Sequence, residues 1–435
     1  MTINPDDGAQ PVPKRSHFAD FTPFRESPAF FRLWLGTTLA GVGSQMTIVA
    51  VGLHVYAITN STGAVALVGV VALVPMIIAG LYGGVLADSF DRRIVALLTE
   101  TAAWLSVMGL VVLAWTGVET LWMYYLLTTL NAVSVTIVAA ARAAIVPRLL
   151  PARLLPAAGG LNGMSFGFQI IVGPAMAGVL VATVGVQWTY TLDAVLFVAA
   201  FTGILTLPPI KPEGSSGTGV SAVINGLAFL GKAPNIRLSF LLDIIAMTFG
   251  MMRALLPAVG ALVIGGGAVT VGVLSSAFAV GVLVSSVLSG RLGGVRWHGL
   301  AIRNAIMGFG ASVLCFGVVL LLAGTAPQGV NLPALVAASL CLVAAGGADN
   351  ISAVFRTTMM QAAVPDGMRG RTQGVFIVVV TGGPRLGDAY IGLVAATALL
   401  WLPSLLGGVL IVVLAFVLVQ THRSFRHYDA LNPTP

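Results

Sequence analysis

The sequence predicts an all-α integral membrane protein with about twelve transmembrane helices in two six-helix halves. Apolar residues make up 57% of the 435 residues and charged residues only 9%, with a mean hydropathy of +0.97. Soluble chains are about 25% charged. The apolar residues fall into twelve stretches, and the turns after the odd-numbered stretches contain no Lys or Arg. Most of the 22 basic residues lie in the tails and the other turns, as expected of cytoplasmic loops.

The N-terminal half follows a polar tail. Residues 1–32 include Pro11, Lys14 and Arg15, and we expect this tail to lie in the cytoplasm. Residues 33–208 form the first half, and each apolar stretch is about as long as a bilayer is thick. The six predicted helices cover 33–59, 65–87, 94–115, 121–141, 163–184 and 189–208.

A polar break at 209–235 separates the two halves. Its Gly- and Ser-containing part has a flexible composition, and the amphipathic stretch from Val220 to Leu230 is expected to lie along the inner membrane surface. The second half is predicted at 236–420, followed by a cytoplasmic tail at 421–435. Its six predicted helices cover 236–263, 270–290, 300–324, 332–358, 372–398 and 402–420. Two such halves around a midplane site are typical of transporters.

Composition also argues against several other classes of protein. The net charge of +7 is spread over many loops, so the positive-inside pattern accounts for it and we expect no nucleic-acid partner. Cys315 and Cys341 fall inside apolar stretches, where buried packing is expected rather than a disulfide or a metal site. No phosphate-binding Gly-Lys-Ser/Thr loop, catalytic triad or metal-ligand spacing is present. We therefore expect neither an enzyme nor a bound cofactor.

The turn between the second and third stretches carries a recognisable motif. It reads GVLADSFDRR over 84–93 and resembles the loop motif of the major facilitator superfamily, Gly-x-x-x-Asp-(Arg/Lys)-x-Gly-(Arg/Lys)-(Arg/Lys). The matching residues are Gly84, Asp88, Arg92 and Arg93. Ser89 and Asp91 depart from the pattern. The resemblance implies a gate that locks the two halves in an outward-facing state. The corresponding loop of the second half, at 289–294, lacks the acidic residue, which argues against a second lock.

The fifth stretch resembles the antiporter motif of the same superfamily. The matching residues are Gly160, Gly173, Pro174 and Gly178. Gln169 and Ala177 replace two of the expected glycines. The resemblance implies proton-driven export rather than import. The alternative is an ordinary helix that is kinked and thinned by its Gly-Pro pair.

The second half strengthens the resemblance. Asp243 and Arg253 in the seventh stretch, Asp349 and Arg356 in the tenth, and GGPRLGD over 382–388 resemble the branch that contains the enterobactin exporter and related bacterial secretion and drug-efflux proteins. This resemblance covers nearly the whole chain. It implies the major facilitator fold and outward movement of a hydrophobic or amphipathic small molecule.

Charged residues inside apolar stretches need a partner or a function, because burying a charge at the bilayer centre costs about 3 kcal/mol or more. The proton-coupling candidates are Asp243, Asp349 and Asp388, and their candidate charge partners are Arg253, Arg356 and Arg385. A coupling carboxyl group must take up and release a proton and face water from each side in turn. The competing interpretation is that these groups form fixed ion pairs.

Four further polar residues are weighed differently. Asp193 lies nearer the outer end of its stretch and ranks lower as a coupling residue. Glu100 could reach Arg92 or Arg93 near the inner surface, which favours a structural role. Gln45 is a candidate for the lining of a central cavity. His54 is either a second cavity residue or, more commonly for a lone imidazole in an apolar helix, a packed and hydrogen-bonded side chain.

The predicted function is secondary active export by alternating access, with proton antiport as the drive and a siderophore or secreted metabolite as the cargo. Multidrug efflux is the alternative. A non-transporting sensor is less favoured, because Asp88, Arg92 and Arg93 are present. We expect a monomer in the bacterial plasma (inner) membrane, with both termini cytoplasmic and with the cargo, protons and the lipid bilayer as partners.

Overall fold

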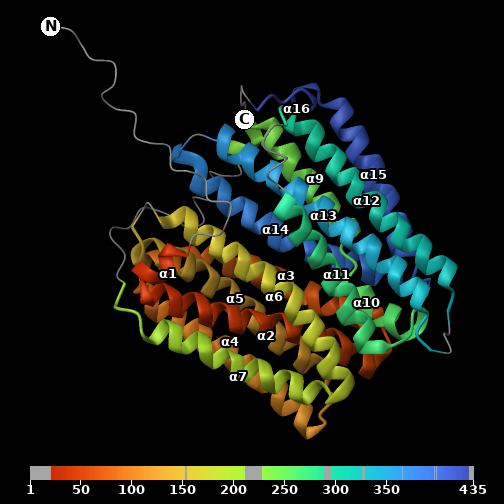
Figure 1. The fold of residues 1–435 in the computed structure, drawn as a ribbon, viewed down its shortest axis with the longest axis horizontal. Helices are drawn as coiled ribbons and strands as arrows, with labels where there is room; N and C mark the ends of the chain where they lie inside the picture. Colours follow the sequence, from red (N-terminus) through yellow and green to blue (C-terminus); the bar gives the residue numbers. More distant parts are fainter. Residues whose placement is uncertain are drawn as a thin grey trace.

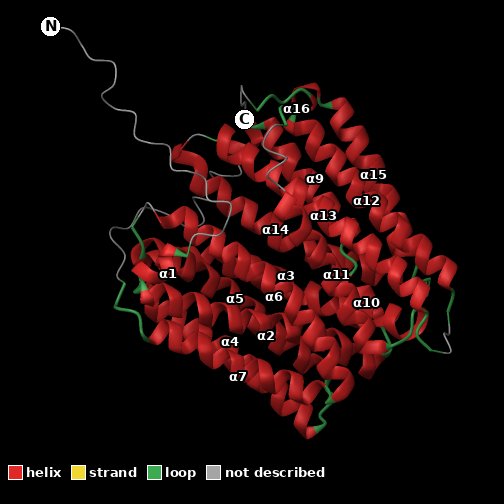
Figure 2. Ribbon diagram, viewed as in Figure 1, coloured by secondary structure: helices red, strands yellow, loops and turns green. Residues whose placement is uncertain are grey.

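A computed structural model describes residues 21–151, 154–210, 228–288, 295–325, 329–364, 366–395, 397 and 399–430. Within these ranges the chain forms helices joined by short loops, and the one extended contact is an isolated bridge between Trp297 and Asp429 (Figure 2). Eleven helical stretches of the described residues are long and apolar enough to cross a membrane. The 30-residue helix Asp366–Ala395 lies between the last two of them and makes the twelfth. The all-α membrane fold is thus confirmed.

The first half, coloured red to yellow-green in Figure 1, contains seven described helices. These are α1 (Thr22–Glu26), α2 (Pro28–Thr59), α3 (Thr62–Ser89), α4 (Arg92–Thr116), α5 (Leu121–Leu149), α6 (Leu155–Thr183) and α7 (Val186–Leu205). Local chemistry sets several of their ends. The Ser27 hydroxyl caps α2 by accepting from the Phe30 amide at 3.2 Å, with Pro28 in the first turn. Asn60 ends the same helix in a left-handed conformation.

The second half, green to blue, contains α9 (Pro234–Gly250) and the helices after it (Figure 1). These are a 3₁₀ turn η2 (Arg253–Leu255), α10 (Leu256–Ala258), a π turn η3 (Val259–Val263), α11 (Gly267–Leu288), α12 (His298–Ala323), α13 (Leu332–Ala363), α14 (Asp366–Ala395), α15 (Leu402–Thr421) and α16 (Arg423–Arg426). The predicted amphipathic stretch from Val220 lies mostly outside the described residues, so the boundaries of the linker remain a prediction.

The seventh predicted helix is broken rather than continuous. α9 ends at Gly250, Met251 is extended, and the chain continues as η2, α10 and η3. Pro257 contributes to the break, because it has no amide hydrogen for a helical bond to the carbonyl of Arg253. Interrupted helices at membrane depth are tolerated where they line a cavity. The break places Arg253 at the start of a short turn instead of on a regular helix face.

The two halves meet mainly through two helix pairs, α3 with α14 and α6 with α11. Gly178 of α6 packs so closely on Gly272 of α11 that a Cβ at residue 178 would lie 2.9 Å from the Gly272 Cα. A Cβ at Gly392 of α14 would lie 3.0 Å from the Cβ of Ala66 in α3. These contacts lie at the end of the bundle whose loops lack Lys and Arg, which we call the neutral end.

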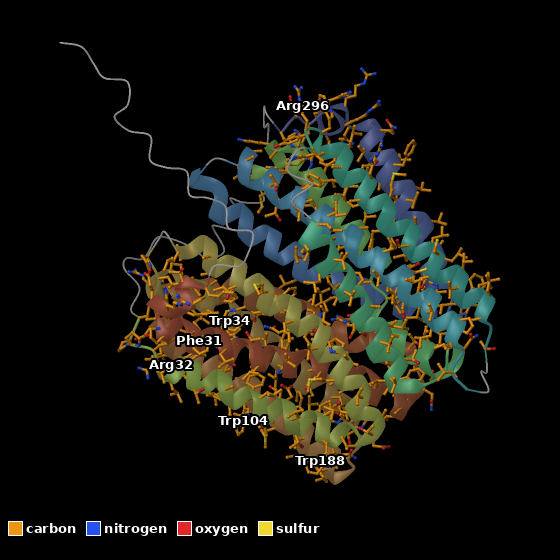
Figure 3. The ribbon with its side chains drawn as sticks, in the orientation of Figure 1. Phe31, Arg32, Trp34, Trp104, Trp188 and Arg296 are labelled. Atoms are coloured by element: carbon orange, nitrogen blue, oxygen red, sulfur yellow. The ribbon has the colours of Figure 1, made fainter. Side chains whose placement is uncertain are left out.

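The other end carries the Arg92–Arg93 turn and the loop at 295–297, and we call it the basic end. There the start of α6 packs on α2 through Leu161, but its glycine face is open, because a Cβ at Gly159, Gly160, Gly163 or Gly167 would meet nothing within 4 Å. Arg32 and Arg296 lie toward this end, whereas Trp188 lies at the neutral end (Figure 3). The halves therefore touch at the neutral end and diverge toward the basic end.

The outer surface of the bundle is apolar, as a lipid-facing surface must be. Leu98, Val287 and Leu322 expose 67%, 77% and 81% of their surface. Cys315 is also exposed and Cys341 is partly exposed, both as free thiols. The expectation of buried packing was therefore wrong for Cys315, because an apolar stretch does not show which of its faces meets lipid.

Candidate functional site

Two adjoining cavities lie between the halves. The larger has a volume of about 500 Å³ and the smaller about 260 Å³. Both are lined by Ile48 and Val49 of α2, by Arg253 of η2 and by Ser275 of α11. A site that spans the two halves is therefore bounded by helices from each.

The walls of the larger cavity are mainly apolar and include thioether and aromatic side chains. Phe166 of α6, Phe278 of α11 and Met247 of α9 contribute to it, with Gln45 of α2 as a polar group. Asp349 and Arg356 of α13 also reach it. Apolar walls with a few charged groups suit an amphipathic ligand.

An acidic triad forms one side of the larger cavity. The buried side chains of Arg356 on α13 and Asp243 on α9 form an ion pair. Asp349 lies two turns before Arg356 on α13, and its Oδ1 is 4.0 Å from Nη2 of Arg356. Its side chain is 22% exposed, whereas those of Arg356 and Asp243 are 4% and 3% exposed. Two carboxyl groups thus share one guanidinium, and Asp349 is the member that water can reach.

A basic triad lies on the smaller cavity. Asp388 of α14 accepts from Nη2 of Arg253 at 3.4 Å, and Nη1 of Arg385 lies 3.7 Å from the same carboxylate oxygen. The Asp388 side chain is 4% exposed, whereas Arg253 is 37% exposed and faces both cavities. Two guanidinium groups therefore share one carboxylate.

The two triads carry opposite excess charge. When all six groups are ionised, the Asp243–Arg356–Asp349 triad carries one negative charge and the Arg253–Asp388–Arg385 triad carries one positive charge. Asp243 and Arg253 stand on either side of the helix break, and both line the larger cavity. In a water-poor site such charges interact strongly with each other and with a charged ligand.

The sequence predicted the members of these triads but only some of their pairings. Arg385 and Asp388 are three residues apart on α14, and the structure brings them together as expected for that spacing. Asp243 and Arg253 lie ten residues apart and do not pair with each other. Asp243 pairs with Arg356, and Arg253 pairs with Asp388.

The antiporter-like motif lies on α6 and contributes to the contact between halves. Pro174 lines the larger cavity. Gly173 packs on α2, where a Cβ would collide with Gln45. Gly178 packs on Gly272 of α11 at the neutral end, while Gly160 lies toward the basic end with open space around it. Three of the four motif residues thus lie at a helix contact or at the cavity.

The loop motif lies at the basic end. Gly84 and Asp88 fall in the last turns of α3, and the side chain of Asp88 is outside the described part of the structure. The Arg92 amide donates to the Ile210 carbonyl at 3.0 Å, and Nη2 of Arg93 donates to the Leu205 carbonyl at 2.8 Å. The turn therefore ties the start of α4 to the end of α7.

The two cavity candidates on α2 lie in different places. Gln45 lines the larger cavity. His54 packs its ring edge against Tyr124 of α5, with centroids 4.9 Å apart, and its Nδ1 lies 3.4 Å from the hydroxyl of Tyr190 on α7. His54 therefore sits between helices of one half.

Two buried polar groups have surroundings that the sequence did not indicate. Glu100 of α4 accepts from Arg142 of α5 at 2.7 Å, a partner 42 residues away. Asp193 of α7 is fully buried and accepts from the hydroxyl of Thr47 on α2 at 2.5 Å. The only signal for Asp193 was a lone carboxyl group in an apolar stretch.

Comparison with known proteins adds a family and a set of relatives. The family model described as transmembrane secretion effector matches residues 18–435. The enterobactin exporter EntS of Salmonella typhimurium strain LT2 is 26% identical over 381 residues, covering 87% of this chain and 88% of the relative. The protein of the same name from Citrobacter koseri is 25% identical over 423 residues, covering 97% and 98% of the two chains.

Solved structures show the same fold at lower sequence identity. A D-xylose–proton symporter superposes with a TM-score of 0.70 at 14% identity, covering 89% of this chain and 97% of the symporter. At that identity the likeness concerns the arrangement of helices alone.

Proposed function

The chain belongs to the transmembrane secretion effector family of major facilitator transporters, and from this premise we propose that it is a secondary active exporter that works by alternating access. The family match bears out the resemblance seen in the sequence. The chain is a multi-pass membrane protein of a transporter family. The cargo, the driving ion and the direction of movement form the proposal.

The observation that carries the proposal is the position of the charged cavities. They lie between two halves that touch at the neutral end through α3, α14, α6 and α11 and diverge toward the basic end. Alternating access needs such a site between the halves, and the site must open at one end while it is closed at the other. With the basic end in the cytoplasm, as the positive-inside pattern indicates, this arrangement can load cargo from the cytoplasm.

The cargo we propose is an amphipathic small molecule with acidic or catechol-like groups, either a siderophore or a secreted metabolite. The relatives named enterobactin exporters support this choice. The partly exposed guanidinium of Arg253 offers a binding partner for such groups, and the walls formed by Phe166, Phe278 and Met247 suit an apolar body. The same apolar walls keep multidrug efflux as the alternative.

The drive we propose is proton antiport. Asp243, Asp349 and Asp388 are carboxyl groups in or beside the cavity whose charge is balanced by Arg356, Arg253 or Arg385. Protonation of one carboxyl group would remove an acceptor for the cargo's hydrogen bonds, so proton and cargo would bind in turn, as antiport requires. The antiporter-like motif on α6 supports the same drive.

The gate we propose is the loop motif of Gly84, Asp88, Arg92 and Arg93 at the basic end. In this account the protein acts as a monomer in the bacterial inner membrane, with both termini in the cytoplasm. Arg92 and Arg93 already hold α4 to the end of α7, so the gate would act on a firmly joined pair of helices.

The experiment is uptake of enterobactin into inside-out vesicles that carry the protein and have an acidic lumen. Accumulation that collapses with a proton ionophore, and that empty vesicles lack, is the expected result. A panel of neutral and cationic drugs in the same assay separates siderophore export from multidrug efflux. No gradient-dependent uptake of any compound would refute the proposal.

A further inference from the structure

Asp193 is a buried carboxyl group outside the two charged triads. It is 0% exposed on α7, inside the N-terminal half. Its Oδ2 accepts from the Thr47 hydroxyl at 2.5 Å, and its Oδ1 has no hydrogen-bond partner among the described residues. The carboxyl group fills the space where a Gly43 side chain would stand on α2. A buried carboxylate without a cation is costly, so this site favours a carboxyl group that holds a proton.

Thr47 connects this carboxyl group with the smaller cavity. Thr47 and Ser44, on the same helix, line that cavity, and Asp388 and Arg385 line it from the other half. The Thr47 hydroxyl can accept a hydrogen from one neighbour while it donates to another. A single hydroxyl group therefore separates a buried acid of one half from the charged cavity shared by both.

A second group of polar side chains lies on the neutral-end side of Asp193. Tyr190 lies one turn earlier on the same face of α7, and its hydroxyl is 3.4 Å from Nδ1 of His54. His54 packs on Tyr124 of α5. Among the described residues, no hydrogen bond joins these side chains to Asp193.

The charged groups on the helices around Asp193 do not neutralise it. On α4, the Trp104 indole donates to the Ala194 carbonyl. Glu100 lies one turn before Trp104 and pairs with Arg142 of α5. α6 has no charged residue along its length, and α2 offers Thr47 and, two turns beyond it, His54. Among the described residues, Asp193 forms no ion pair with any of these groups.

We propose that Asp193 is a proton-binding residue of the N-terminal half, which exchanges its proton with the cavity through Thr47. This inference rests on the proposed proton antiport. When the Thr47 hydroxyl turns its hydrogen toward the cavity, its oxygen can accept from the neutral carboxyl group. The O–H bond of Asp193 then breaks as its proton passes to Thr47, whose own proton passes to cavity water. The carboxylate left behind regains a proton from cavity water by the same steps in reverse, once the cavity opens to the other side.

Infrared difference spectroscopy of the protein in lipid, between about pH 5 and about pH 9, tests the protonation without any cargo. We expect a C=O band of a protonated carboxyl group that disappears in Asp193→Asn. The matched control Glu100→Gln removes another buried acid, one that is already paired, and should leave this band in place. A band that survives in Asp193→Asn would overturn the proposal.

A second variant keeps the carboxyl group and removes its link to the cavity. Thr47→Val preserves the shape of the side chain, so we expect the band to remain, shifted, and to exchange in D₂O about tenfold or more slowly. Unchanged band position and exchange would show that Thr47 is not the link and would overturn this part of the proposal.

Uptake of enterobactin into inside-out vesicles then separates this inference from the proposed function. If Asp193 couples protons, Asp193→Asn loses about tenfold or more of the accumulation driven by the pH gradient and keeps downhill movement. Wild-type uptake that ignores the pH gradient would refute proton antiport itself. Gradient-driven uptake that is equal in wild type and Asp193→Asn would refute only the role of Asp193.

Discussion

The carboxylate of Asp388 on α14 occupies the space in which a side chain at Gly69 on α3 would begin. The same carboxylate accepts from Arg253 and lies beside Arg385. One residue thus links the basic triad of the C-terminal half to the backbone of the N-terminal half. A change in the charge of Asp388 would therefore alter both its contacts with the arginines at the cavity and the packing of α14 on α3.

Gly69→Ala tests this contact. The added methyl group would displace the Asp388 carboxylate from its arginines, so we expect a loss of gradient-driven uptake and a destabilisation of about 1–3 kcal/mol. Uptake in inside-out vesicles and thermal unfolding in detergent measure the two effects. Gly80→Ala on the same helix is the control, because its nearest neighbour is the Thr136 Cγ2 at 3.6 Å. Equal losses in both variants would argue against a special role for the Asp388 contact.

Asp388→Asn tests proton coupling at the basic triad. The amide oxygen can still accept a hydrogen bond from Arg253, but the group cannot bind and release a proton. We expect accumulation of enterobactin against its gradient to be lost while binding to the purified protein remains measurable. Glu100→Gln, a buried acid away from both cavities, should keep its uphill transport. Unchanged uphill transport in Asp388→Asn would remove this residue from the coupling mechanism.

Asp243→Asn tests the acidic triad through stability. It leaves the buried guanidinium of Arg356 with only the distant Asp349, and removing one member of such a pair costs about 3–5 kcal/mol. Asp349→Asn should cost less than about 1 kcal/mol, because Asp349 is partly exposed and 4.0 Å from Arg356. The double variant Asp243→Asn with Arg356→Gln should recover part of the loss in thermal unfolding. Similar losses for the two single variants would contradict this ranking.

Asp88→Ala tests the gate that the loop motif predicts. We expect the variant to favour the state that is open at the basic end, because the resemblance assigns this residue to the lock of the other state. Single cysteines at each end of the bundle, in a background with Cys315 and Cys341 replaced, report accessibility to a membrane-impermeant thiol reagent. Ser89→Ala is the neighbouring control. An accessibility pattern that matches that of the control would speak against a gating role.

The apolar pattern predicted where the chain crosses the membrane better than where its helices end. α5 continues to Leu149 and α6 begins at Leu155, both beyond the predicted apolar stretches, because a helix can extend into water once its residues become polar. The break after Gly250 was not predicted, because the residues on both sides are apolar and the stretch keeps a continuous hydropathy. Hydropathy reports the solvent around a segment and not its backbone geometry.

The site was predictable as a set of residues and only partly as a set of contacts. Burial cost singled out the charged residues of both triads, and helical spacing predicted the pair Arg385 and Asp388. The pairing of Asp243 with Arg356 spans 113 residues of chain and depends on how α9 packs on α13. Asp193 ranked low because it lies nearer the outer end of its stretch, and nothing in the sequence indicated its partner Thr47, an uncharged residue on another helix.

The most direct test of alternating access is a disulfide that locks the neutral end. In Ala66→Cys with Gly392→Cys, the two Cβ atoms would lie about 3.0 Å apart, so a small shift brings them to the roughly 3.5–4.5 Å of a disulfide. With Cys315 and Cys341 replaced, oxidation should abolish uptake of enterobactin into inside-out vesicles, and reduction should restore it. Each single-cysteine variant should transport under both conditions. Full uptake by a completely cross-linked protein would show that α3 and α14 need not separate at this end, which contradicts the account.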